Sequence, residues 1–114
     1  MNAINYNGRK FRSVNNSPNG EVDADTVFHY SQKDEIVWAI YQGGAIRWGT
    51  LIAKVDEAGS LEMRYQHVNT RGEIMTGICH STPEILPDGR LRLHEDRQWT
   101  SGDGSKGRSV VEEI

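Results

Sequence analysis

The chain has 114 residues and a formal net charge of −3, so we expect a single domain, residues 1–114, with a modest core. The negative charge and the absence of any basic run argue against nucleic acid as a partner. No apolar stretch reaches the length of a membrane span or a signal-peptide core, and the single cysteine, Cys79, allows no internal disulfide. These features predict a cytoplasmic protein without a membrane partner.

Apolar and polar residues alternate at strand spacing along most of the chain. In order, the predicted strands span residues 9–14, 26–31, 36–42, 45–55, 60–68, 73–82, 91–100 and 108–114. The pair Gly43-Gly44 is typical of a two-residue hairpin, and the segment LPDGR at 86–90 is typical of a turn. No segment has an apolar repeat at helical spacing. About eight strands joined by short turns predict an all-β, antiparallel up-and-down meander closed into a small barrel, with a two-layer sandwich as the alternative.

Two predicted turns of the same shape, residues 56–59 and 69–72, join the three central predicted strands. If each closes as a four-residue hairpin loop, Trp48 faces His67 and Thr50 faces Tyr65, so that apolar residues share one face. The predicted interior positions up to the third central strand are Thr26, Phe28, Tyr30, Val37, Ala39, Tyr41, Ile46, Trp48, Thr50, Ile52, Leu61, Met63, Tyr65, His67, Ile74, Thr76 and Ile78. The same alternation points Leu91, Leu93, Glu95, Arg97 and Trp99 inward on the strand that follows.

Several interior aromatic residues should converge at the barrel end away from the turn at 56–59. An apolar cup with a few polar groups is the usual form of a small-ligand pocket, although aromatic side chains also plug small barrels. A buried Glu95 would need a partner, for which Arg97 or a histidine would serve. The predicted ligand-binding residues are Tyr41, Trp48, Tyr65, His67, Glu95 and Trp99.

Four apolar residues fall on the predicted outer face of adjacent strands: Ile36, Trp38, Ile40 and Leu51. An exposed apolar patch of this kind usually marks an interface. We therefore expect either a homodimer or a terminal segment folded over this face.

The sequence offers no recognisable catalytic or metal-binding pattern. None of the four histidines has the spacing of a ligand pair, and Cys79 has no activating neighbour on its own face of the strand. We predict no metal, no cofactor and no catalytic residue.

The motifs NSPNGEV (16–22), MRYQHVN (63–69), LPDGR (86–90) and QWTSGD (98–103) resemble a family of small bacterial proteins that often carry the label N-acetylglutamate synthase. The resemblance implies an amino-acid N-acetyltransferase, with His67 or Glu95 as the base. However, the chain has no strand–glycine–helix unit of the kind that binds the pyrophosphate of acetyl-CoA. The residues themselves favour a non-catalytic, ligand-binding barrel of the calycin kind, comparable to avidin or a lipocalin, with a protein-interaction module as a further alternative.

Overall fold

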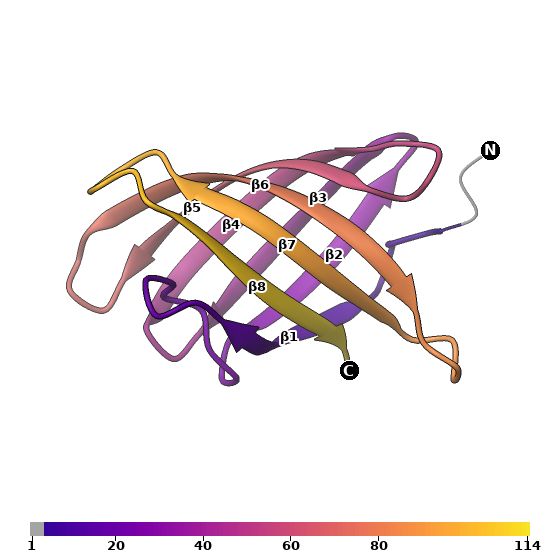
Figure 1. Ribbon diagram of the computed structural model, residues 1–114, viewed down its shortest axis with the longest axis horizontal. Helices are drawn as coiled ribbons and strands as arrows, with labels where there is room; N and C mark the ends of the chain where they lie inside the picture. The colour runs from indigo at the N-terminus through magenta and orange to yellow at the C-terminus, as the bar shows by residue number, and fades with distance from the viewer. Residues whose placement is uncertain (1–3) are drawn as a thin grey trace.

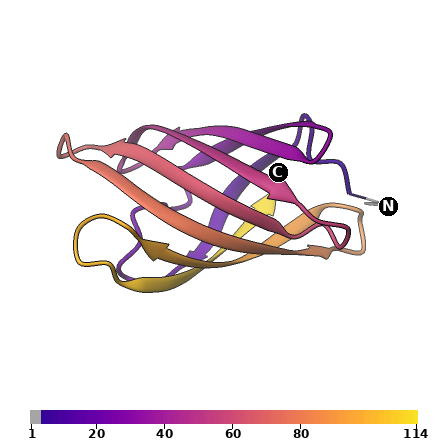
Figure 2. The ribbon, with the colours of Figure 1, turned by 90° about the horizontal axis from the view of Figure 1, so that it is seen from above.

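The computed structural model describes residues 4–114, which form a closed antiparallel barrel. Each strand pairs with the next along the chain, and the last strand pairs with the first (Figures 1 and 2). The strands are β1 (Lys10–Asn16), β2 (Val27–Lys33), β3 (Ile36–Gly43), β4 (Ile46–Val55), β5 (Leu61–Asn69), β6 (Ile74–Ile85), β7 (Leu91–Trp99) and β8 (Lys106–Glu113). The predicted all-β meander and barrel closure are confirmed, and the sandwich is excluded. No helix of this part of the chain is long and apolar enough to cross a membrane.

The turns after β4, β5 and β6 share one geometry. In the first turn, the Asp56 N–H donates to Ser60 O at 3.0 Å, and the Gly59 N–H donates to Asp56 O at 3.0 Å. The glycine in each turn is left-handed, with φ values of 85°, 78° and 88° at Gly59, Gly72 and Gly89. A left-handed glycine of this kind forms a bulge, so the loops after β4 and β5 have five residues in place of the predicted four, whereas the turn at 86–90 has the predicted length.

This extra residue corrects the predicted register. Met63 on β5 pairs with Ala53 on β4 and with Cys79 on β6, one position away from the predicted partners. Because strand side chains alternate between faces, a shift of one residue reverses the faces of β6 and of β4 from Trp48 onward. A bulge between Ile46 and Trp48 keeps Ile46 in the interior, as predicted. The buried positions on those two strands are Ile46, Gly49, Leu51, Ala53, Gly77, Cys79 and Ser81.

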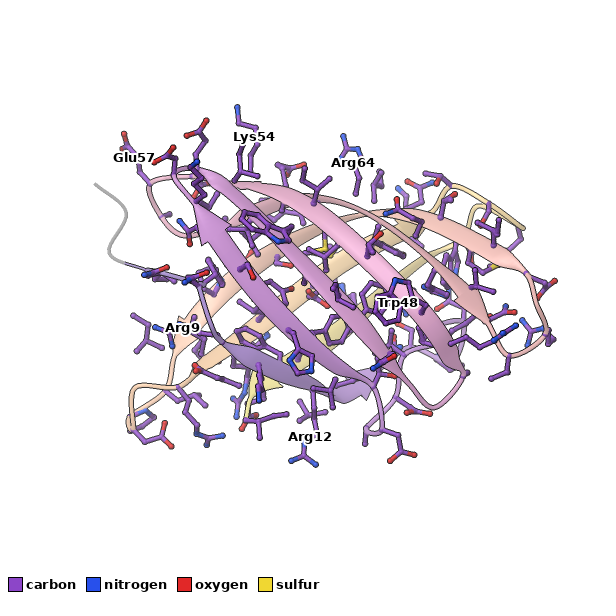
Figure 3. The ribbon with its side chains drawn as sticks, turned by 180° about the vertical axis from the view of Figure 1, so that it is seen from behind. Arg9, Arg12, Trp48, Lys54, Glu57 and Arg64 are labelled. Carbon is purple, nitrogen blue, oxygen red and sulfur yellow. The ribbon has the colours of Figure 1, made fainter. Side chains whose placement is uncertain are left out.

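Trp48, Ile52 and Ile74 were predicted to face the lumen and are instead 51%, 57% and 70% exposed. Figure 3 shows Trp48 on the outside of the sheet. Thr50, Thr76 and Ile78 also leave the interior and are half-buried. Leu51, predicted as part of an outer interface, is buried in the lumen, 4% exposed.

One end of the barrel is closed by apolar packing. Tyr6, which precedes β1, is fully buried, and its hydroxyl donates to Gly59 O at 2.5 Å. Its backbone N–H donates to Gln32 Oε1 at 2.8 Å, and its ring lies 5.9 Å from the ring of Tyr30. The neighbouring core residues of this closed end are Phe11, Leu61, Leu91 and Leu93.

Candidate functional site

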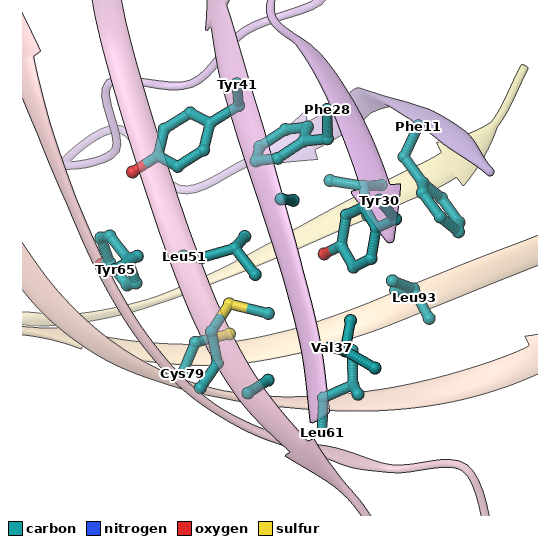
Figure 4. Close-up of a cluster of buried hydrophobic side chains, with 14 of the residues drawn as sticks. Phe11, Phe28, Tyr30, Val37, Tyr41, Leu51, Leu61, Tyr65, Cys79 and Leu93 are labelled. Atoms are coloured by element: carbon teal, nitrogen blue, oxygen red, sulfur yellow. The ribbon is translucent and has the colours of Figure 1, made fainter. Parts of the chain in front are cut away.

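The opposite end of the barrel, here called the open end, carries the aromatic cluster expected from the sequence. Tyr41 and His67 each lie two residues before the end of their strands, β3 and β5, and Trp99 ends β7; all three are buried. The His67 ring lies 5.7 Å from the Tyr41 ring and 5.8 Å from the Trp99 ring. Tyr65 packs edge-on against Trp99 at 5.9 Å. Tyr41 and Tyr65 face the lumen together with Leu51 and Cys79 (Figure 4).

Two glycines make room for the tyrosine rings. Tyr41 pairs with Gly49 on β4, and a Cβ atom at Gly49 would lie 2.4 Å from the Tyr41 ring. Tyr65 pairs with Gly77 on β6, where a Cβ would lie 2.2 Å from the Tyr65 ring. Each ring therefore lies flat on bare backbone of the next strand, which fixes its orientation. A two-residue hairpin at Gly43-Gly44 would place Trp38 across from Gly49, but the observed register places Tyr41 there.

His67 links the aromatic cluster to a carboxylate. Its Nε2 lies 2.7 Å from Glu21 Oε1, and its Nδ1 lies 2.9 Å from the Tyr41 hydroxyl. A carboxylate only accepts, so Nε2 carries the proton on this side. In the neutral imidazole, Nδ1 then accepts from Tyr41. Glu21 Oε2 accepts from Asn69 Nδ2 at 3.0 Å and from Arg71 Nη2 at 2.8 Å.

Glu21 belongs to the connection between β1 and β2, and residues 17–25 of this connection form a strap across the open end. The indole N–H of Trp99 donates to Asn19 O at 3.0 Å, and Asn19 Nδ2 donates to Ser105 Oγ at 2.9 Å. On the other side of the strap, Asn16 Nδ2 donates to Val22 O at 2.7 Å. The strap is thus held by β5 through Glu21 and by the β7–β8 turn through Asn19. Sequence reasoning missed Glu21, because its segment has turn chemistry and no periodicity that would place a side chain.

Glu95 has a different partner from the one predicted. Ser81 Oγ and Ser109 Oγ donate to its two carboxylate oxygens at 2.9 and 3.1 Å. Burial raises its pKa, and the two serine hydrogen bonds partly oppose this shift. The expected ion pair with Arg97 or a histidine is absent from residues 4–114.

Arg97 instead turns toward the strap and the open end. Its Nη2 donates to Asn16 Oδ1, and its Cζ lies 5.9 Å from the Trp99 ring centroid. Arg97 Nη1 and the hydroxyl of Tyr65 are both buried, and neither has a hydrogen bond of ordinary distance and angle to a described residue. The two groups nevertheless lie close to each other, since Arg97 acts on the pKa of the Tyr65 hydroxyl. Burial raises the pKa of Tyr65 above its ordinary value, while the nearby Arg97 opposes the shift.

A cavity of about 40 Å³ remains in the lumen between these groups. Roughly 10–15 Å³ of such space holds one water, so the cavity has room for only a few small atoms. Five of the six predicted ligand-binding residues line it: Tyr41, Tyr65, His67, Glu95 and Trp99. The sixth, Trp48, lies outside the barrel and is excluded from this site by the shifted register of β4.

The described residues form neither a reactive cysteine nor a metal site. Cys79 is buried, and burial raises its pKa well above the ordinary value, which disfavours the reactive thiolate. No group of three or more His, Cys, Asp or Glu side chains within residues 4–114 is arranged to hold a metal ion.

A closed up-and-down barrel with a narrow aromatic lumen is the architecture of the small barrels that enclose one small ligand. The model of one family, described as avidin-like protein, matches residues 4–114, and the chain belongs to this avidin-like family. No curated protein and no solved structure matches the chain. The synthase activity implied by the resemblance of its motifs gains no support from the family or from the fold.

Proposed function

We propose that this protein is a non-catalytic binding protein that holds a small, partly apolar molecule at the open end of its barrel. The observation that carries the proposal is a buried aromatic cup around a cavity with two unpaired polar atoms, Tyr65 Oη and Arg97 Nη1. Membership of the avidin-like family supports the same class of function. The cup itself is formed by Tyr41, Tyr65, His67 and Trp99.

The strap sets the size of the ligand. With Glu21 bound to His67, the cavity holds only a few atoms, so a larger ligand requires the strap to move outward. Ligand binding then competes with the contacts of Glu21. Weakening these contacts should raise the population of the open barrel and strengthen the apparent affinity for larger ligands.

Trp99 provides a direct test. The double substitution Trp38→Phe/Trp48→Phe removes the two exposed tryptophans. Trp99, which lines the cavity, is then the single tryptophan of the described chain. The neutral apolar probe N-phenyl-1-naphthylamine should change Trp99 emission in a saturable way, and Glu21→Ala should lower its Kd.

The matched control is Glu57→Ala, which removes an exposed carboxylate at the other end of the barrel and should leave the Kd unchanged. An absence of saturable change in both the parent and the Glu21→Ala protein would contradict the proposed function.

A second proposal concerns the outer face of β3 and β4. We propose that this face mediates self-association, as a homodimer, because large apolar residues gather on it without cover from the described residues. Trp38, which is 42% exposed, pairs with Ile52 on β4. The other exposed apolar residues of this face are Ile36, Ile40 and Trp48.

Light scattering after size exclusion should give a dimer mass for the parent protein and a monomer mass for Trp38→Glu. A parent protein that stays monomeric at every concentration would contradict the dimer, while a pull-down partner lost in Trp38→Glu would indicate a different protein on this face.

A further inference from the structure

We propose that the lumen binds a carboxylate, with one oxygen accepting from Arg97 Nη1 and the other from the hydroxyl of Tyr65, so that the ligand is a small carboxylic acid. This inference deepens the proposed function and rests on it. It concerns the interior of the barrel and not the Glu21 contacts at its rim.

The first argument is the charge of Arg97. The carboxylates that line the cavity already have donors, since Glu21 is bound by three side chains and Glu95 by two serines. Arg97 has only the amide of Asn16 and the face of Trp99, and no carboxylate lies within ion-pair distance of it among residues 4–114. A partly buried guanidinium without a counter-ion favours the binding of an anion.

The second argument is the hydroxyl of Tyr65. Tyr65 is only 9% exposed, and Gly77 under its ring holds the hydroxyl in place. This hydroxyl stays protonated at neutral pH, because burial raises its pKa. An uncharged donor beside a cationic donor suits the two oxygens of one carboxylate.

The third argument is space. A cavity of about 40 Å³ takes roughly three to four atoms of water size, which is close to the size of acetate. Longer acids would extend toward His67 and Trp99 and would need the strap to open.

A water molecule offers the simplest alternative occupant. Asn19 Oδ1 is a third buried polar atom without a partner in the described chain. It lies near Arg97 Nη1, because a Cβ added at Gly107 would be 2.7 Å from Asn19 Oδ1 and 2.9 Å from Arg97 Nη1. A water bridging these two atoms would satisfy the guanidinium without any ligand. Binding of a carboxylate in preference to its neutral amide separates the two possibilities.

The test uses acetate and acetamide as probes, at pH 7 and constant ionic strength, in the Trp38→Phe/Trp48→Phe background. Acetate should change Trp99 emission saturably, while acetamide should bind at least about ten-fold more weakly, as expected for a hydrogen bond to a charged group. Arg97→Met should raise the acetate Kd about ten-fold or more, and Arg97→Lys should restore part of the affinity.

Two further variants guard against a purely structural effect. Tyr65→Phe keeps the packed ring and should raise the acetate Kd several-fold. Arg64→Met changes the exposed residue that precedes Tyr65 on β5 and should leave the acetate Kd unchanged. Equal binding of acetate and acetamide, or an acetate Kd unaffected by Arg97→Met, overturns the carboxylate site but leaves a ligand-binding barrel. A lack of acetate binding also overturns it, and the neutral naphthylamine probe then decides the proposed function separately.

Discussion

The two ends of the barrel are built from the same strands but satisfy their polar groups in opposite ways. At the closed end, Tyr6 fills the lumen and pairs both its hydroxyl and its backbone N–H. At the open end, Tyr65 and Arg97 are buried with atoms that have no partner in residues 4–114, beside a cavity. Buried polar atoms without partners are expensive and concentrate at functional sites. The difference teaches that the closed end satisfies its polar groups within the fold, whereas the open end leaves polar atoms unpaired at the place where we propose that a ligand binds.

The largest effect should come from the closed end. Tyr6→Ala leaves a cavity among apolar side chains and should lower the free energy of unfolding by about 3–5 kcal/mol. Tyr6→Phe loses only the hydrogen bond to Gly59 O and should cost about 1 kcal/mol. Urea denaturation of both variants measures this difference, and a Tyr6→Ala protein as stable as Tyr6→Phe would show that Tyr6 does not seal the barrel.

Removing a hydrogen-bonded hydroxyl at the open end should have an intermediate effect on the free energy of unfolding. Tyr41→Phe removes the hydroxyl that donates to His67 and leaves a buried imidazole nitrogen unpaired. The expected loss is about 1–3 kcal/mol in the free energy of unfolding, measured by the same denaturation. A neutral result would mean that the link between Tyr41, His67 and Glu21 contributes nothing to the native state.

Glu95 should make stability depend on pH. Its pKa is raised in the folded chain by burial, so the unfolded chain loses its proton first as the pH increases. The carboxyl therefore causes a loss of stability as pH rises from below the ordinary glutamate pKa through the raised one. The stability of Glu95→Gln relative to the parent protein should increase between pH 4 and pH 8, with Glu57→Gln as the exposed control. A difference that stays constant with pH would show that Glu95 does not titrate abnormally.

The smallest effect on stability should come from removing a hydroxyl that has no hydrogen-bond partner. Tyr65→Phe removes a buried hydroxyl that has no partner in the described chain, and should be neutral or stabilising by up to about 1 kcal/mol. Thermal unfolding of Tyr65→Phe beside Tyr41→Phe sharpens the comparison, because two buried tyrosines of one lumen should respond in opposite directions. A marked loss of stability in Tyr65→Phe would indicate a structural hydrogen bond and weaken the case for a ligand.

The strands and the barrel could be predicted because alternation and turn residues are local signals. The interior faces of β5 and β7 also followed from alternation, and with them Tyr65, His67, Glu95 and Trp99. The faces of β4 and β6 depend on loop length to a single residue, and the glycine at the fourth position of each turn was the available sign of a five-residue loop. A four-residue loop would turn Trp48 into the lumen and Leu51 outward, the reverse of what the structure shows.

Glu21 and the unpaired atoms of the lumen could not be predicted. Glu21 reaches His67 across 46 positions of the chain from an irregular segment, and nothing local in the sequence encodes that contact. Arg97 was expected to neutralise Glu95, since a buried carboxylate needs a partner. Serines on β6 and β8 take that place, so Glu95 does not pair with Arg97.

The most direct test of the difference between the two ends is protein-observed NMR during titration with butyrate and, separately, butyramide. We predict that the indole N–H of Trp99 and the backbone amides of the strap and of residues 67–71 shift in a saturable manner, while the amides of turns 56–60 and 86–90 at the closed end do not move. Shifts confined to the closed end or to the outer face of β3 and β4, or no saturable shift with either probe, would contradict a ligand site at the open end.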